Sequence, residues 1–191
     1  MRYRLRLATM DDRDEISALI ARSARGLSAN HYRPDQVEGA LAGAFGLDTS
    51  LVRDATYFVV VTPENELAAC GGWSKRRTVF GGDARAERDD SELDPRREPA
   101  KIRAFFVDPG HARRGLAGMI LDRCELEARK SGFASLELMA TLPGLEFYEV
   151  RGFTPGPPQQ IPLPGGSEIT FVPMRKELSL LPRSAREKGR G

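Results

Sequence analysis

Residues 108–121, DPGHARRGLAGMIL, combine groups that could bind an anion. Arg113 and Arg114 precede Gly115, and a stretch with helical apolar spacing follows directly. The first backbone N–H groups of a helix have no partner within it, and the helix dipole favours negative charge there. A glycine lets a ligand approach the backbone because it has no Cβ. The turn therefore predicts an anion site on residues 113–118, with arginines suited to phosphate.

The same composition has a second interpretation. Ala117 and Gly118 are also small, so this helix start could simply pack tightly on a sheet. Spacing alone does not separate packing from binding. The stretch contains neither the GxxxxGK[ST] of a nucleotide-binding P-loop nor the GxGxxG of a dinucleotide-binding fold. These two classes of phosphate site are therefore not supported.

Other side chains that could do chemistry are few. Cys70 and Cys124 lie in apolar surroundings, which predicts two buried free thiols rather than a disulfide. His31 and His111 have no partner at the spacing of metal ligands. We therefore expect no metal.

Charge and hydropathy indicate a globular domain. The 191 residues are 40% hydrophobic and 29% charged, and the formal net charge is only +2. This balance predicts no general attraction to nucleic acid or membrane. Residues 179–191 are locally basic, and we expect a solvated, disordered tail; a nucleic-acid-binding arm would carry a denser basic run. No apolar run reaches the length of a membrane span and no signal peptide pattern follows Met1, so we expect a cytoplasmic protein.

The elements that must position the turn follow from apolar periodicity and turn residues. They are, in chain order, a strand at 3–9, a helix from a cap at Thr9 to Gly26, a helix at 34–46, strands at 56–62 and 66–76, a strand at 101–108, a helix to Ser131, a strand at 135–141, a short helix at 143–151 and a strand at 167–178.

This order predicts one α/β domain over residues 1–178 with a mixed sheet. The hairpin at 56–75 is antiparallel, whereas the strand–helix–strand unit at 101–140 requires a right-handed parallel crossover. Gly71 and Gly72 weaken their strand or mark a bulge. Residues 76–100 are polar and charged, and we predict a long loop that is mobile or borders the substrate site.

Two motifs bring a family resemblance. The segments VDPGHARRGLAGMILDRCELEARKSGF and LELMATLPGLEFYEVRGF resemble the acetyl-coenzyme-A-binding core of the GNAT N-acetyltransferases. The sequence ARRGLA, residues 112–117, occupies the family's Q/R-x-x-G-x-G/A signature, and FYEVRGF, residues 147–153, matches its second one. The resemblance covers residues 3–178 and implies a largely antiparallel sheet with one splayed parallel strand pair and flanking helices. Three departures are Ala112 in the signature, Thr141 where relatives carry asparagine, and no glutamate base at 101 or 103.

The resemblance also implies a site for acetyl-CoA between the splayed strands 101–107 and 135–141. The pantetheine arm would pair with backbone groups of Phe105 and Val107, and the pyrophosphate would lie on residues 113–118. The Phe105 N–H would stabilise the oxyanion. The cofactor-binding residues implied in this way are Phe105, Phe106, Val107, Arg113, Arg114, Gly115, Leu116, Ala117 and Gly118.

The matching tyrosine of relatives protonates the departing thiolate, which assigns that role to Tyr148. Trp73 is a candidate for the acceptor pocket, with a core position as the alternative. If residues 103, 105 and 107 share a face by alternation, Arg103 lies near the reacting end and could bind an acceptor carboxylate; the alternative is a surface ion pair. No base follows from the sequence, which leaves Glu137, Tyr57, His111 and a water chain open.

The function implied is transfer of an acetyl group from acetyl-CoA to a primary amine by direct attack. The acceptor is a small molecule or a peptide, and the sequence does not specify which. It also does not decide between a monomer and a homodimer. The alternative function is a catalytically silent regulator that binds coenzyme A.

Overall fold

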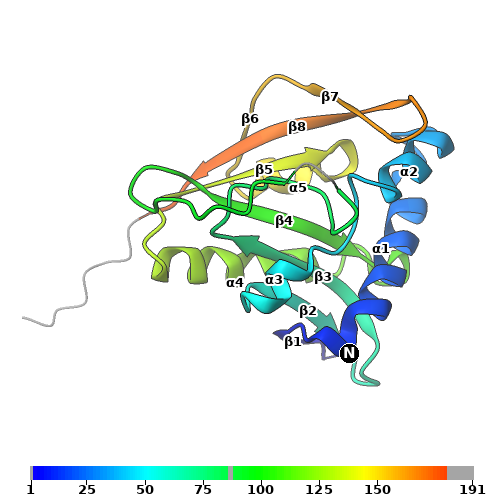
Figure 1. The fold of residues 1–191 in the computed structure, drawn as a ribbon. Coiled ribbons are helices and arrows are strands. Elements are labelled where there is room, and N and C mark those ends of the chain that lie inside the picture. The colour runs from blue at the N-terminus through cyan, green and yellow to red at the C-terminus, as the bar shows by residue number, and fades with distance from the viewer. Residues whose placement is uncertain (1, 86–87, 180–191) are drawn as a thin grey trace, which may run out of the picture.

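The computed structural model describes residues 2–85 and 88–179, and their fold is shown in Figure 1. Within this part of the chain the strands form one sheet in the order β1-β2-β3-β4-β5-β8-β6, and β7 also pairs with β8. The strands are β1 (Arg4–Leu7), β2 (Tyr57–Val61), β3 (Leu67–Ser74), β4 (Ala100–Val107), β5 (Ser135–Thr141), β6 (Thr154–Pro155), β7 (Gln159–Pro162) and β8 (Glu168–Glu177).

All strand pairs are antiparallel except β4 and β5, which are parallel. These two strands pair only at Ala100–Leu136 and Lys101–Glu137, and beyond these pairs they diverge. The predicted fold class is thus confirmed, including the hairpin, the parallel crossover and the splayed pair. The helices are α1 (Arg13–Ser28), α2 (Pro34–Leu41), α3 (Thr49–Arg53), α4 (Leu116–Lys130) and α5 (Leu145–Val150).

The helices cover both faces of the sheet, and each face has its own core (Figure 1). On one face, α4 buries the predicted stripe of Leu116, Ile120, Cys124 and Ala128. On the other face, α1 buries Ile16, Leu19, Ile20 and Ala24 together with residues of α2 and α3. Below, these are called the α4 face and the α1 face. Apolar burial of this kind, at roughly 25 cal/mol per Å², is the main favourable term in folding.

Helix ends differ from the prediction at two points. Helix α1 continues past Gly26, because this glycine provides a close approach rather than a stop: a Cβ there would lie 2.5 Å from Cγ of Pro109. Helix α2 ends at Leu41, earlier than the predicted end near Gly46, and the short helix α3 follows. Strands β6 and β7 were not predicted either.

The long segment between β3 and β4 has no helix or strand among its described residues beyond an isolated bridge between Arg76 and Glu92. Several of its arginines bind groups on the body of the domain, as Arg76 does with Asp54 at 2.7 Å. Both cysteines are buried and free, as predicted. The predicted basic tail, apart from Ser179, lies outside the described residues. Among the residues that are described, no helix is long and apolar enough to cross a membrane.

Candidate active site

The glycine turn after β4 has the backbone of an anion site. Gly115 is the N-cap of α4 in the left-handed region, with φ of +78°, and Arg113 has φ of +62°. A Cβ on Gly115 would meet no atom within 4 Å. Glycine is therefore favoured here by backbone conformation and leaves the surface of the turn open.

The N–H groups of this turn have no acceptors. Among the described residues, nothing accepts a hydrogen bond from the backbone N–H groups of residues 113–118. Bonding resumes at Met119, whose N–H donates to the Gly115 carbonyl at 3.1 Å. The side chains of Arg113 and Arg114 are exposed beside these donors. Free donors, a helix N-terminus and two cations fit a diphosphate.

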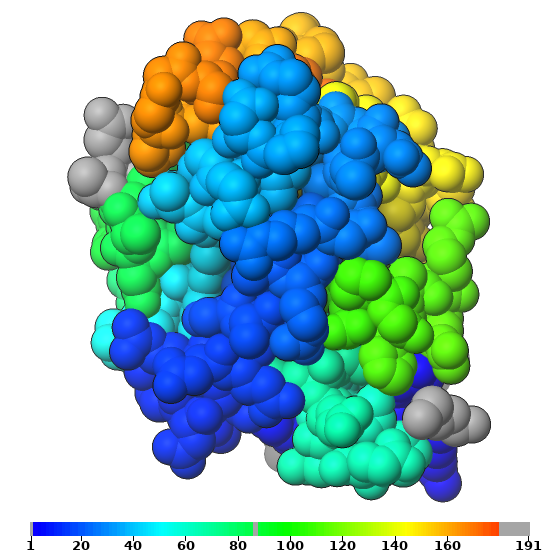
Figure 2. All heavy atoms as spheres, turned by 90° about the vertical axis from the view of Figure 1, so that its right-hand side faces the viewer, coloured from blue at the N-terminus to red at the C-terminus, as the bar shows by residue number. Residues whose placement is uncertain are grey.

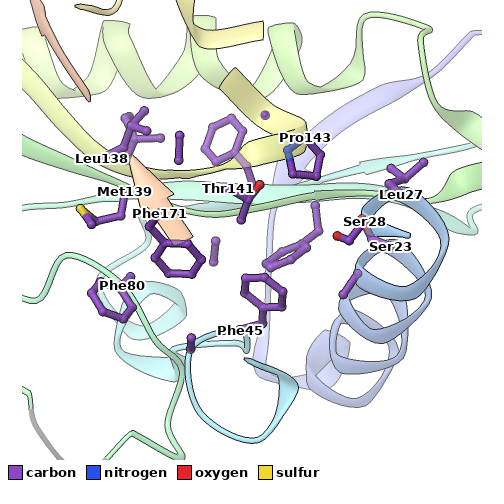
Figure 3. A pocket seen from close by; sticks show the side chains of 18 of the residues that line it. Ser23, Leu27, Ser28, Phe45, Phe80, Leu138, Met139, Thr141, Pro143 and Phe171 are labelled. Atoms are coloured by element: carbon purple, nitrogen blue, oxygen red, sulfur yellow. The ribbon is translucent and has the colours of Figure 1, made fainter. Parts of the chain in front are cut away.

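A pocket of about 230 Å³ opens where β4 and β5 diverge (Figure 3). Its lining includes Phe105 and Leu138 from the α4 face, and Phe45 and Phe171 from the α1 face. The pocket therefore passes through the sheet. Ala117, in the first turn of α4, also lines it and connects it to the glycine turn.

Helix α1 borders the outer end of the pocket through Ser23, Leu27 and Ser28 (Figure 3). Figure 2 shows α1 in blue beside the green segment that follows β4, and Arg22 binds Asp108 there at 2.9 Å. The Val107 N–H donates to the Ser23 hydroxyl at 3.2 Å, so it points into the gap rather than to β5. The N–H of Phe105, two residues earlier, lies on the same edge of the strand.

The edge of β4 is shaped by a bulge. Phe106 pairs with Cys70 and Arg103 with Gly72, so two residues of β4 oppose Gly71 alone. Ala104 within the bulge has φ of +52°. The predicted alternation is therefore wrong for Arg103: the extra residue places its side chain on the face opposite Phe105.

Tyr148 lies in the pocket wall on the α4 face. Its side chain is buried, and its ring makes edge contacts with Phe147 at 5.0 Å and Phe105 at 6.3 Å between centroids. Burial raises the pKa of the Tyr148 hydroxyl well above its usual value of 10. The hydroxyl stays protonated at neutral pH and can donate its proton, and the raised pKa makes it a weaker acid than an exposed phenol.

Arg103 and Trp73 do not reach the pocket. The buried guanidinium of Arg103 binds Asp48 at 3.1 Å and the carbonyls of Thr78 and Gly81 at 2.8 and 2.7 Å. Burial lowers the pKa of Arg103 against the opposing effect of Asp48. Trp73 is buried against Phe133 in the core of the α4 face, at 6.0 Å between ring centroids.

The candidate bases also lie outside the pocket lining. Glu137 binds Lys101. Tyr57 donates its hydroxyl to the Ala104 carbonyl at 2.8 Å, and burial raises its pKa. His111 shares a hydrogen bond of 2.9 Å with the Tyr3 hydroxyl.

The sequence analysis missed the residues that line the α1 face of the pocket: Phe45, Phe80, Met139 and Phe171. They come from four separate segments, and no local pattern distinguishes them from core residues. Phe80 belongs to the long loop, so this loop borders the pocket. That it borders a substrate site stays a prediction.

The sequence matches the model of a known family. The model of the acetyltransferase (GNAT) family matches residues 24–153, and the chain belongs to this family. No curated protein sequence matches the chain.

Solved structures agree on the fold. A GCN5-related N-acetyltransferase from Rhodopseudomonas palustris has a TM-score of 0.68 at 16% identity, covering 93% of this chain and 97% of that one. The PaiA N-acetyltransferase from Thermoplasma acidophilum, solved with coenzyme A, gives 0.61 at 12% identity and covers 93% and 99%. The ribosomal-protein-S18-alanine N-acetyltransferase from Escherichia coli gives 0.59 at 16% and covers 96% and 98%.

Proposed function

We propose that the protein transfers an acetyl group from acetyl-CoA to a primary amine. The observation that carries the proposal is the continuity of the site. Unpartnered N–H groups on residues 113–118 adjoin, through Ala117, a pocket that crosses the sheet beside Tyr148. Coenzyme A has the matching chemistry, with a diphosphate at one end of a long arm and a thiol at the other.

The residues present fit this molecule. The turn would hold the diphosphate with backbone groups of Gly115, Leu116, Ala117 and Gly118 and the side chains of Arg113 and Arg114. The free edge of β4 at Phe105, Phe106 and Val107 would hold the pantetheine arm as a strand edge holds a peptide. When bound, acetyl-CoA supplies an acetyl thioester. Among the neighbours, the T. acidophilum protein was solved with coenzyme A.

Two groups of the chain would then serve the reaction. The N–H of Phe105 would donate to the acetyl oxygen, on which negative charge develops as the amine attacks. The carbon–nitrogen bond forms and the carbon–sulfur bond breaks. The Tyr148 hydroxyl would give its proton to the departing sulfur, and the amine releases a proton to solvent.

A pair of substitutions at Gly115 tests the cofactor site. Gly115→Asp places a negative charge among the N–H groups, and we expect binding of coenzyme A to weaken by well over tenfold, roughly 2 kcal/mol. Gly115→Asn is the matched control, because asparagine has the same shape without the charge and tolerates this backbone conformation. Both affinities can be measured by calorimetry.

The Asn variant adds a side chain without the charge, so it should weaken binding less than the Asp variant, and the difference between the two measures the effect of the charge. If both variants bind coenzyme A like the unmodified protein, the diphosphate does not lie on this turn. If coenzyme A binds but no amine is acetylated, the protein is the silent regulator described above.

A further inference from the structure

The pocket contains no charged side chain. Of the residues that line it in the described part of the chain, none is Asp, Glu, Lys, Arg or His. The polar side chains in the lining are those of Ser23, Ser28, Thr141 and Tyr148. Within the described residues, the lining itself therefore offers no carboxylate for an ammonium group and no cation for a carboxylate. The guanidinium of Arg85 lies over the Phe80 ring, 3.8 Å from its centroid, but Arg85 does not line the pocket.

On the α1 face the lining is an aromatic wall, defined by Phe45, Phe80, Phe106 and Phe171. Phe45 contacts Phe106 edge-on at 5.7 Å and stacks on Phe171 at 6.0 Å between centroids, and Phe80 meets Phe171 edge-on at 5.4 Å. Met139 extends this wall (Figure 3). These rings, mostly packed edge to face, give this side of the pocket an apolar, aromatic lining against which another ring can pack.

This surface discriminates strongly against charged acceptors. An unpaired ammonium or carboxylate loses its hydration in an apolar pocket, which costs several kcal/mol. Amino acids and polyamines would carry such charges into the site. An uncharged aromatic molecule would instead gain apolar contact with this wall without losing the hydration of a charge.

The missing base leads to the same class of acceptor. An amine must be neutral to attack a thioester, and an alkylamine with a pKa near 10 is neutral in only about one molecule per thousand at pH 7. The three candidate side chains lie outside the pocket lining and are engaged elsewhere: Glu137 binds Lys101, Tyr57 donates to a backbone carbonyl, and His111 shares a hydrogen bond with Tyr3. An amine attached directly to an aromatic ring is already neutral at pH 7, because the ring delocalises its lone pair.

We propose that the acceptor is an arylamine, an uncharged aromatic molecule whose primary amino group is bonded to the ring. This inference rests on the proposed acetyl transfer and deepens it. The ring lies against the aromatic wall, and the amino nitrogen faces the gap between β4 and β5. Attack forms the nitrogen–carbon bond and breaks the carbon–sulfur bond. The leaving sulfur takes the proton of Tyr148, the nitrogen loses a proton to water, and water returns a proton to the Tyr148 oxygen.

Two isomers test the class of acceptor. 4-Methylaniline and benzylamine have the same atoms, but at pH 7 the first is neutral and the second is an ammonium. With acetyl-CoA and the purified protein, we expect kcat/KM at pH 7 to be at least tenfold higher for 4-methylaniline. From pH 7 to 9 the value should stay flat for 4-methylaniline and rise about tenfold per pH unit for benzylamine.

Equal or better use of benzylamine at pH 7, or a preference for spermidine or an amino acid, would overturn the arylamine assignment and leave acetyl transfer standing. Failure to bind coenzyme A would instead overturn the proposed function. Absence of any acetylation of 4-methylaniline, with coenzyme A bound, also counts against the assignment.

A variant pair locates the acceptor on the aromatic wall. Phe80→Leu removes one ring face, and we expect KM for 4-methylaniline to rise fivefold or more while KM for acetyl-CoA stays the same. Phe133→Leu is the matched control, because this buried ring packs on Trp73 outside the pocket. An unchanged acceptor KM in Phe80→Leu would place the acceptor elsewhere.

Discussion

At the scale of single residues, the pocket holds one side chain able to move a proton at neutral pH. Tyr148 lies against Phe147 and Phe105, and burial keeps its hydroxyl protonated. The other hydroxyls of the lining belong to serines and a threonine, which are weaker acids than a phenol. If the departing sulfur takes its proton from the chain, Tyr148 is the group that the geometry favours.

Replacing Tyr148 with phenylalanine keeps the ring and its packing and removes only the hydroxyl. We expect kcat to fall by about 10²-fold, while the affinity for coenzyme A and the thermal stability change little. Single-turnover rates are the better measure, because product release can hide a slower chemical step. Tyr3→Phe is the control: it removes a hydroxyl outside the pocket lining and should leave the single-turnover rate within about twofold. Unchanged rates in Tyr148→Phe would make this tyrosine a packing residue.

At the scale of elements, Arg103 ties the long loop to the sheet. Its guanidinium on β4 binds the carbonyls of Thr78 and Gly81, which flank Phe80 of the aromatic wall. It also binds Asp48, the N-cap of α3. Burial alone would raise the pKa of the Asp48 carboxyl. The hydrogen bond from the Ser50 hydroxyl and the charges of Arg103 and Arg88 outweigh burial, so the pKa is lowered. The position of Phe80 thus depends on a buried charge pair.

Arg103→Leu should therefore destabilise the protein and loosen the loop. Removing one partner of a buried charge pair costs about 3 kcal/mol or more, although Arg88 also binds Asp48 and softens the loss. Urea unfolding measures the stability, and limited proteolysis should show faster cutting within residues 76–99.

The control is Arg77→Leu, the same substitution at an arginine of the long loop itself. The pair of Arg77 with Glu98 is partly solvent-exposed, unlike the buried pair of Arg103 with Asp48, and its loss should cost less than about 1 kcal/mol. Equal stability and equal cutting rates in the two variants would show that Arg103 does not hold the loop.

These elements also show the limits of the sequence. Strong periodicity predicted α4 and the strands around it, because the stripe from Leu116 to Ala128 is long and regular. Strand β7 was not predicted because it lies in a proline-rich stretch. It forms as an edge strand, where the N–H that a proline lacks is not needed for pairing. The bulge at Ala104 was not predicted, because a positive φ is expected at glycine or asparagine and not at alanine. That single residue moved Arg103 away from the predicted site.

At the scale of the whole molecule, the sheet has two parts that meet at few hydrogen bonds. Strands β1 to β4 form one part and β5 to β8 the other, and β4 and β5 pair only at two positions. The gap beyond Lys101 opens into the pocket, in which we assign the edge of β4 to the pantetheine arm of coenzyme A and the aromatic wall to the acceptor. A ligand bound there would bridge the two parts and supply partners for the free edge of β4.

Hydrogen exchange can show this bridging directly. The amides of Phe105 and Val107 face the gap, and the bond of Val107 to the Ser23 hydroxyl is long at 3.2 Å, so both should exchange through local opening without ligand. Saturating coenzyme A should slow their exchange by tenfold or more, because the arm pairs with this edge. The amides of β7, an edge strand of the other part of the sheet, also exchange locally and should be unaffected. If coenzyme A binds by calorimetry and the exchange of Phe105 and Val107 stays unchanged, the arm does not run along β4, and the two parts of the sheet are not bridged by the ligand.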